Sequence, residues 1–268
     1  MTTPITVTHT ALAKIRILSF NIHKGFDWTS QKLTLEIMKE AITSSKADIV
    51  FLQEVIGENA EHVKKVKDWN SLPQYEILAG EIWPYYAYAK NAVYEAGHHG
   101  NVILSKFPIT YWAQEDISTN RFEQRGILYC NIEIPRGYEK LSRNHIIHAY
   151  CLHLDLLHRG RKQQYQAIMK RLKMDVNDPE ITIVAGDFND WNQRSGDIFE
   201  DQLGMLEVSK ILTGEYAKTF PIYKPLFTLD RIYVKHIGVD LVQTLKDGIW
   251  RSLSDHAALY TELSINYE

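Results

Sequence analysis

The chain has 268 residues, of which 45% are hydrophobic and 24% charged, the ordinary balance of a folded protein with a large core. Because single-domain sandwiches commonly run to about 250 residues, we expect one domain over residues 1–268, with 1–13 as a less ordered N-terminal stretch. The formal net charge of −3 excludes the overall basic bias that accompanies tight, sequence-independent binding of long nucleic acids.

The location expected from the sequence is the cytoplasm. The N-terminal residues lack a basic region followed by an apolar run and a cleavage site, so they do not resemble a secretory signal. No apolar run reaches the roughly 18–20 residues of a membrane span, although a peripheral membrane substrate stays compatible. Cys130 and Cys151 lie in apolar runs and are expected to be buried free thiols, which fits a reducing compartment.

Short runs rich in Ile, Val, Leu and Tyr recur along the chain and predict β-strands. They begin at Ile15, Asp48, Asn101, Ile127, His145, Ile181, Asp230 and His256. Helical spacing of apolar residues predicts amphipathic helices over about 31–46 and 161–174, on the outside of the sheets. The pattern indicates an α+β fold of sheets covered by helices.

Polar side chains interrupt these runs where the strands begin or end. Asn21, Glu54, His153 and the pair Asp187 and Asn189 stand at predicted strand ends. Strand beginnings carry Asp230, Asp255 and His256. The start of an antiparallel strand borders the end of its neighbour, so these side chains are expected to converge on one edge of the sandwich. Each residue alone is more simply a turn residue or a local hydrogen-bonding group, and the prediction depends on the whole set.

The set suits phosphoester hydrolysis assisted by a hard cation. Mg²⁺ prefers oxygen ligands and is commonly held by one or two carboxylates, which Glu54 and Asp255 can supply. We therefore expect Mg²⁺, with Mn²⁺ as the alternative. The sequence has no cluster of Cys and His at zinc spacing. It also lacks the GxSxG, GxxxxGK[ST] and GxGxxG motifs of serine hydrolases, P-loop proteins and dinucleotide-binding proteins.

An ordered series of motifs from about Ile15 to Leu263 resembles the endonuclease/exonuclease/phosphatase superfamily. The motifs are SFNIH, LQE, GNVILSKFPI, HLD, GDFND, LDRIYV and SDHAAL. The superfamily includes deoxyribonuclease I, exonuclease III-type repair nucleases, neutral sphingomyelinases, inositol polyphosphate 5-phosphatases and tyrosyl-DNA phosphodiesterases. The resemblance implies a four-layer α/β/β/α sandwich of two mainly antiparallel sheets and a one- or two-metal phosphoesterase mechanism.

The resemblance also implies a role for each motif residue. Glu54 matches the metal-binding glutamate, and Asn21 and Asp255 match groups that complete the metal site. Asp187 matches the residue that orients or deprotonates the attacking water, with Asn189 as its partner. His256 matches the histidine that contacts the scissile phosphate, and Asp230 matches the carboxylate that holds this histidine.

His153 is similar to the histidine of the deoxyribonuclease, sphingomyelinase and tyrosyl-DNA phosphodiesterase branches, where exonuclease III-type enzymes have a tyrosine. After Asn21 the chain continues Ile22, His23, without the acidic residue of the exonuclease III type, so abasic-site cleavage is disfavoured. The SFNIH start with the KGF segment that follows it, and the RxxQ spacing of Arg161 and Gln164, resemble a bacterial subgroup of uncharacterised superfamily members. Some of these members are encoded beside cardiolipin synthases.

The expected substrate is a phosphodiester, and two classes stay open. For a nuclease or DNA-end phosphodiesterase, Asn101 and Arg125 would bind substrate and Trp191 would stack a base. Further phosphate contacts could come from Arg121, Arg159, Arg161 and Lys162, although a solvated helix start is the simpler interpretation. For a phospholipid or small phosphoester, the aromatic stretch from Glu81 could form an apolar wall, although strands packing their rings inward are the simpler interpretation. A catalytically inactive binding module is the third class, and no protein partner is implied.

Overall fold

The computed structural model describes residues 11–67, 69–121, 123–176 and 179–266. It contains two six-stranded sheets. The first sheet has the strand order β11-β12-β1-β2-β4-β3, and the second has β5-β6-β7-β8-β10-β9. The strands of the first sheet are β1 (Ala13–Asn21), β2 (Ile49–Asn59), β3 (Tyr85–Tyr94), β4 (Gly97–Ser105), β11 (Gly238–Leu245) and β12 (Ala258–Ile265). Those of the second are β5 (Ile109–Asp116), β6 (Gly126–Ile134), β7 (His145–His153), β8 (Ile181–Asp187), β9 (Leu206–Glu207) and β10 (Asp230–Lys235).

Each sheet contains one parallel pair among antiparallel neighbours, so both are mainly antiparallel, as predicted. The parallel pairs are β1 with β2 and β7 with β8. Parallel neighbours need a crossover, and helices α1 (Leu35–Ser44) and α4 (His158–Asp175) supply it. The remaining helices are α2 (Ala60–Lys65), α3 (Gln74–Ala79), α5 (Gly196–Phe199) and α6 (Val208–Thr213), with 3-10 helices η1 (His23–Gly25) and η2 (Gly248–Ser252).

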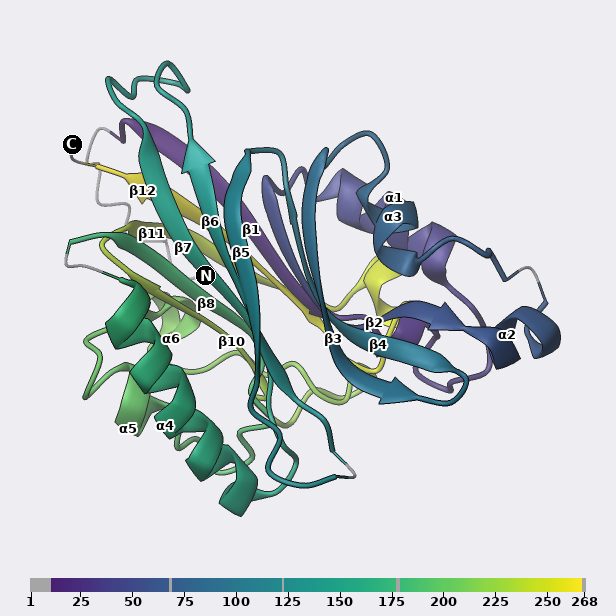
Figure 1. The fold of residues 1–268 in the computed structure, drawn as a ribbon. Helices are drawn as coiled ribbons and strands as arrows, with labels where there is room; N and C mark the ends of the chain where they lie inside the picture. Colours follow the sequence, from purple (N-terminus) through teal and green to yellow (C-terminus); the bar gives the residue numbers. More distant parts are fainter. Residues whose placement is uncertain (1–10, 68, 122, 177–178, 267–268) are drawn as a thin grey trace.

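Three hydrophobic clusters separate four layers of secondary structure. The largest cluster lies between the two sheets and includes Ile17 and Phe51 of the first and Ala149 and Ile183 of the second. A second cluster packs α1 and α3 on the outer face of the first sheet, and a third packs α4 on the outer face of the second. Figure 1 shows these helices on opposite sides of the paired sheets. The predicted α/β/β/α sandwich is confirmed.

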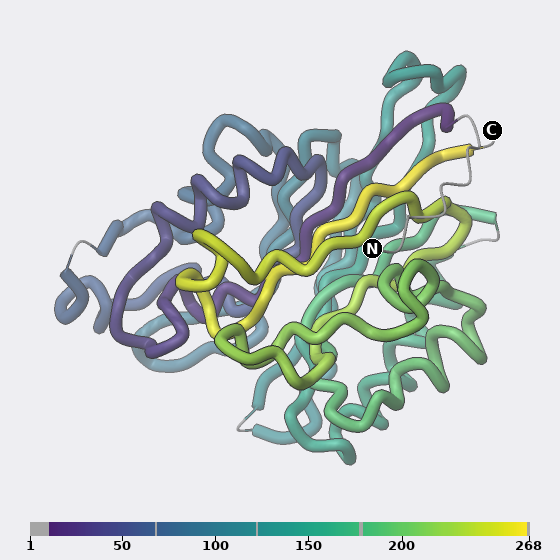
Figure 2. The backbone as a smooth tube through the Cα atoms, turned by 180° about the vertical axis from the view of Figure 1, so that it is seen from behind, coloured from purple at the N-terminus to yellow at the C-terminus, as the bar shows by residue number. Residues whose placement is uncertain are grey.

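The two ends of the described chain lie side by side. β1 pairs antiparallel with β12 from Ala13 opposite Ile265 to Ser19 opposite Leu259. Figure 2 shows this pair as the adjacent purple and yellow tubes. Of the predicted N-terminal stretch, residues 1–10 lie outside the described residues, whereas β1 already begins at Ala13. The single domain over 1–268 stays a prediction.

Several predicted boundaries were wrong. The first helix begins at Leu35 rather than near Gln31, because the preceding residues form a loop in which Phe26 bridges Leu33. The second helix begins at His158, three residues before the predicted start.

The aromatic run after Glu81 does not pack all its rings inward, since Tyr85 and Tyr86 on strand β3 are more than 40% exposed.

Both cysteines are buried and free, as expected. Among the described residues, no helix is long and apolar enough to cross a membrane.

Candidate active site

Alternation along the strands places the candidate site between the two sheets. Successive side chains of a strand point to opposite faces, so every second residue of the central strands faces the opposing sheet. In β8 these residues are Ile183 and Ala185 of the central cluster, and the next in the series is Asp187. In four other strands, too, the inner face changes from apolar or small residues to a polar residue. These polar residues are Asn21 in β1, Gln53 in β2, His153 in β7 and Asp230 in β10. The intersheet core therefore becomes polar at one edge.

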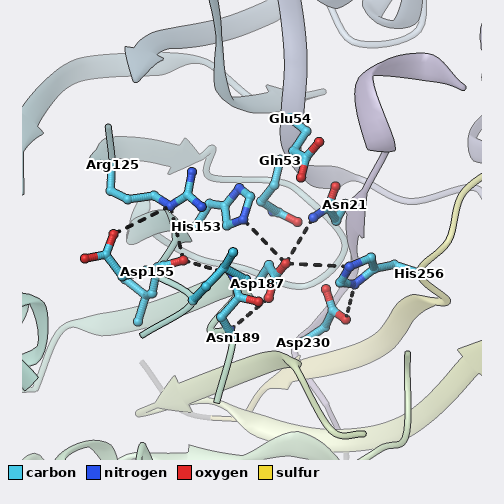
Figure 3. A network of polar contacts seen from close by, with 12 residues as sticks. Asn21, Gln53, Glu54, Arg125, His153, Asp155, Asp187, Asn189, Asp230 and His256 are labelled. Atoms are coloured by element: carbon cyan, nitrogen blue, oxygen red, sulfur yellow. Dashed lines mark hydrogen bonds and ion pairs between the residues drawn. The ribbon is translucent and has the colours of Figure 1, made fainter. Parts of the chain in front are cut away.

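Asp187 is the centre of this polar edge (Figure 3). Its Oδ2 accepts a hydrogen bond of 3.0 Å from the Asn21 side chain, and its Oδ1 accepts one of 2.9 Å from the backbone N–H of Asn189. The Nε2 atoms of His153 and His256 lie 3.6 and 3.7 Å from Oδ2. Four predicted site residues thus surround the carboxylate of a fifth, although they come from segments far apart in the sequence.

A second carboxylate orients His256. Its Nδ1 lies 2.9 Å from Oδ2 of Asp230, which starts β10 directly opposite Asp187 in the sheet register. Burial alone would lower the pKa of His256, but the carboxylates of Asp230 and Asp187 outweigh it and raise this pKa to about 10. His256 is therefore an imidazolium at neutral pH, with Nε2–H aimed at Asp187.

The second imidazole has the opposite character. Burial, followed by the positive charge of Arg125, holds the pKa of His153 well below its ordinary value, so the ring is neutral. Burial raises the pKa of Asp187 to about 7, while the His256 cation opposes this rise and the Asp230 carboxylate adds to it. The site combines one cation, one neutral imidazole and one carboxylate with a weakened preference for ionisation.

Glu54 was predicted to end its strand. It lies instead in a bulge within β2. The register with β4 shifts between Leu52 and Val55, and Glu54 has a φ of 57° between them. A non-glycine residue with positive φ is strained, and such strain commonly marks functional positions. The bulge turns the Glu54 carboxylate toward the site edge, where Figure 3 shows it next to Gln53 and Asn21. Its oppositely charged neighbour is Lys24, whose Nζ lies 3.9 Å from Oε2.

Asp255 lies on the loop before β12, and its position is tied to Asn21 through Ser254. The Ser254 hydroxyl donates to the backbone carbonyl of Asn21 over 2.7 Å, and it accepts from the His256 N–H over 3.2 Å. The Asp255 carboxylate lies 3.7 Å from Nδ1 of His23 and is partly exposed. The SDH segment is therefore joined directly to the end of β1.

Comparison with known proteins identifies this arrangement. Residues 18–256 match the model of the Endonuclease/Exonuclease/phosphatase family. The chain belongs to this family. It is 39% identical over 250 residues to the uncharacterized protein YbhP of Escherichia coli strain K12, a match that covers 93% of this chain and 96% of that protein.

Solved structures of the endonuclease/exonuclease/phosphatase family share the fold at low sequence identity. A family member from Beutenbergia cavernae superposes with a TM-score of 0.71 at 15% identity, covering 94% of this chain and 72% of that one. TDP2 from Caenorhabditis elegans gives 0.66 at 16% identity, with 94% and 99% covered. A mannosyl-6-phosphatase from Bacteroides thetaiotaomicron gives 0.65 at 16%, with 93% and 99% covered. The family acts on phosphoesters by hydrolysis, and this chain is a phosphoesterase of that kind.

Two groups of side chains offer ligand atoms for the divalent cations that family members use. Asp187, Asp230 and His256 form a buried cluster whose ligand atoms lie within 4.8 Å of one another. Part of that capacity is already used, because His256 Nδ1 is bonded to Asp230. The predicted set of Asn21, Glu54 and Asp255 offers only oxygen atoms, and two of its members are carboxylates that are partly exposed to solvent. This donor chemistry fits a hard divalent cation.

The predicted substrate-binding residues fall into three situations. Asn101 is completely buried. Its side chain donates to the carbonyls of Gly126 and Cys151 in the opposite sheet, with a length of 3.2 Å for each hydrogen bond. Arg125 is partly buried, and its Nε donates over 3.2 Å to the Leu154 carbonyl, which also accepts from the Asn189 side chain. Trp191 is 38% exposed. Substrate binding by these residues stays a prediction, and the geometry favours it for Arg125 and Trp191 only.

Arg161 is a correction to the predicted phosphate contacts. It is fully buried, and its Nη1 donates to the backbone carbonyls of Asp155 and Leu156. Gln164 of the same RxxQ pattern accepts over 2.9 Å from the Asp155 N–H. Arg161 and Gln164 are about one helical turn apart on the buried side of α4, so both can hydrogen-bond the backbone of the HLD loop. They hold the site in place without facing a substrate.

Asp155 and Lys24 lie close to the site but have no role predicted from the sequence. Asp155 is buried in the HLD loop, accepts from the Thr119 hydroxyl over 2.5 Å, and lies 3.9 Å from Nε of Arg125. Lys24 has a φ of 57° and is placed by Gln74, whose side chain donates to the Lys24 carbonyl over 2.7 Å. Their motifs, HLD and KGF, were visible, but their neighbours were not.

Proposed function

We propose that this protein is a Mg²⁺-dependent phosphodiesterase whose reaction centre is Asp187. The observation that carries the proposal is the surroundings of its carboxylate. One oxygen is held by Asn21 and lies within 3.7 Å of two imidazoles, while the other is held by the Asn189 N–H. A carboxylate fixed in this way beside a cation suits the orientation and deprotonation of an attacking water.

The proposed roles follow from charge. The water oxygen bonds to phosphorus as the ester P–O bond breaks, its proton passes to Asp187, and the leaving oxygen is protonated from solvent. The His256 imidazolium, held by Asp230, donates Nε2–H to a phosphoryl oxygen where negative charge develops. Neutral His153 can donate to the same group from the opposite side of Asp187. The Asn189 side chain is fixed by its hydrogen bond to the Leu154 carbonyl, and in this position it aligns the water.

The oxygen ligands of Glu54, Asn21 and Asp255 would hold the metal ion. A bound Mg²⁺ neutralises charge on phosphoryl oxygens and stabilises a leaving oxygen. The strained backbone at Glu54 supports this assignment, because it turns the carboxylate toward the site edge, where Lys24 is its ionic neighbour. Mn²⁺, which takes similar ligands, is expected to substitute for Mg²⁺.

Among substrates, the geometry favours a phosphodiester with an aromatic or heterocyclic group, such as the end of a DNA strand. Trp191 packs on Phe220 with ring centroids 5.9 Å apart, and Phe220 in turn lies 4.9 Å from the His256 ring. An aromatic surface thus begins at the residue proposed to contact the phosphate, which suits base stacking. The buried free thiols agree with a cytoplasmic location.

A phospholipid or small phosphoester is the second candidate. Trp28 and Tyr223 form an exposed aromatic pair, 50% and 58% exposed with ring centroids 5.7 Å apart, as side chains at a lipid interface would be. The mannosyl-6-phosphatase among the fold neighbours acts on a small ester. A catalytically inactive binding module is disfavoured, because such a module would not need the buried pair of Asp230 and His256.

The test is hydrolysis of bis-p-nitrophenyl phosphate with Mg²⁺, Mn²⁺ or EDTA, by the wild type and by Asp187→Asn. We expect turnover that EDTA abolishes and that Asp187→Asn lowers by about 10²–10⁴-fold. Asp197→Asn is the matched control, because this carboxylate is exposed on α5 and pairs with Arg194. Full activity in EDTA or in Asp187→Asn would refute the proposal. Single-stranded DNA, sphingomyelin and cardiolipin then distinguish the substrate classes.

A further inference from the structure

His99 is a histidine of β4 that the proposed mechanism does not use. Asn101, two residues later on the strand, faces the second sheet, because it donates to the carbonyls of Gly126 and Cys151 there. Ile103 belongs to the intersheet cluster and continues the same face. Alternation therefore places His99 on this inner face as well, one step nearer to the polar edge than Asn101.

The strand register brings His99 beside the bulge of β2. It lies opposite Ile56, one residue pair beyond the bulge that contains Glu54. On the same face, Asn101 donates to the carbonyl of Gly126, the residue that follows Arg125. The charges of Glu54 on β2 and of Arg125 in the loop before β6 both act on the His99 ring. His99 therefore lies near both the predicted metal ligand Glu54 and the predicted substrate-binding residue Arg125.

The ring of His99 has an unmet hydrogen-bonding capacity. Its Nδ1 is buried and has no hydrogen-bond partner among the residues that the structure describes. Burial, followed by the charge of Lys24, lowers the pKa of His99 to about 4, while Glu54 opposes the change. A neutral imidazole has one donor and one acceptor nitrogen. A buried polar atom without a partner is costly, so a bound ligand that supplies one would gain affinity.

We propose that His99 is a substrate-binding residue that hydrogen-bonds the ester group lying on the Arg125 side of the scissile phosphate. Figure 3 shows Arg125 and His256 at opposite ends of the network around Asp187. One arm of a diester would then lie toward His256 and the aromatic surface, and the other toward Arg125 and His99. A monoester has one arm, so contact with His99 favours diesters. This inference depends on the proposed function.

The experiment compares His99→Leu and His99→Asn on bis-p-nitrophenyl phosphate and p-nitrophenyl phosphate. One lost neutral hydrogen bond predicts that His99→Leu raises KM for the diester about 3- to 10-fold, with kcat and the monoester KM within about twofold. His99→Asn, which keeps a donor and an acceptor, should recover part of the loss. The matched control is His98→Asn, because the Nδ1 of His98 bonds the Tyr88 hydroxyl over 2.9 Å on the other face.

Binding is also measured directly, without turnover. Titration of bis-p-nitrophenyl phosphate into Asp187→Asn and into Asp187→Asn with His99→Leu should give Kd values about 3- to 10-fold apart. Equal Kd values, or equal effects of His99→Leu on both esters, would overturn the role of His99. A wild type that hydrolyses neither ester would instead refute the proposed function, while the titration still decides about His99.

Discussion

The imidazole of His256 is held between two carboxylates of neighbouring strands. Its Nδ1 lies 2.9 Å from Asp230 at the start of β10, and its Nε2 lies 3.7 Å from Asp187 at the end of β8. Because these strands are antiparallel, Asp230 and Asp187 are direct register partners. One backbone pairing therefore determines both the charge of the imidazole and the direction of its free N–H.

Asp230→Asn should lower the pKa of His256 from about 10 toward its ordinary value of 6.5, because the nearest stabilising charge is lost. A raised folded-state pKa contributes stability that is complete below pH 6.5 and is lost as pH rises through 10, so the variant should lose it at lower pH. NMR titration of the His256 ring measures the shift, with exposed His158 as the internal control. An unchanged titration would contradict the assigned pairing.

Glu54→Gln should weaken the use of Mg²⁺, since a neutral amide is a poorer ligand for a hard cation than a carboxylate. We expect the half-saturating Mg²⁺ concentration to rise by about 10–100-fold, with less change in turnover at saturation. Activity measured across a Mg²⁺ series tests this. The matched control is Glu61→Gln, because Glu61 is exposed on α2 and pairs with Lys65. Superimposable curves for wild type and Glu54→Gln would remove Glu54 from the metal site.

Trp191→Ala should raise KM for substrates with an aromatic group. The ring packs edge-on against Phe220 and against Phe227, at 5.9 and 4.9 Å between centroids, and its exposed part would continue that surface toward the substrate. Loss of one stacked base costs about 1–3 kcal/mol, so KM for a short single-stranded oligonucleotide should rise at least about fivefold. Trp112→Ala on edge strand β5, 50% exposed, is the control. Equal KM values would exclude stacking on Trp191.

Glu207→Gln should stabilise the protein above neutral pH. This carboxylate is buried, its Oε2 accepts from the Lys210 N–H at the start of α6, and its Oε1 has no hydrogen-bond partner among the described residues. Burial raises its pKa to about 7, although Arg231 opposes the rise. A raised carboxyl pKa means that wild-type stability falls as pH increases from about 4.5 to 7.

The uncharged glutamine side chain of this variant avoids that loss, so the variant should gain about 1–3 kcal/mol over the wild type at pH 8 and much less at pH 5. Denaturant unfolding at the two pH values measures the difference. Glu180→Gln, a partly exposed carboxylate beside His148, is the control. A difference that does not change with pH would show that Glu207 is ionised throughout.

The strands that sequence analysis found and missed differ in position within the sheets. All the strands predicted from apolar runs are central ones, whose residues are buried on both faces. The four strands outside those runs, β3, β5, β9 and β11, are the edges of the two sheets, and of these only β3, in the aromatic stretch after Glu81, was interpreted as a strand. Their residues are largely exposed or half-buried, as in β5, so little hydrophobic signal marks them.

The identities of the site residues were readable because polar groups interrupt apolar strands at Asn21, His153, Asp187 and Asp230. Their roles follow from the family resemblance. Arg161 shows the limit of such reasoning, since a basic residue near the HLD motif looked available for phosphate but is buried under the loop. Burial depends on the packing of α4, which the local sequence does not specify.

The amino-acid sequence by itself determined the fold class, the reaction class and the set of polar residues at strand ends, because these depend on local periodicity and on the order of motifs. Only the tertiary structure decided which groups share Asp187, that Glu54 projects from a bulge, and that His99 faces the same edge. Those relationships depend on register between distant strands, and a shift of one residue would turn each side chain to the opposite face.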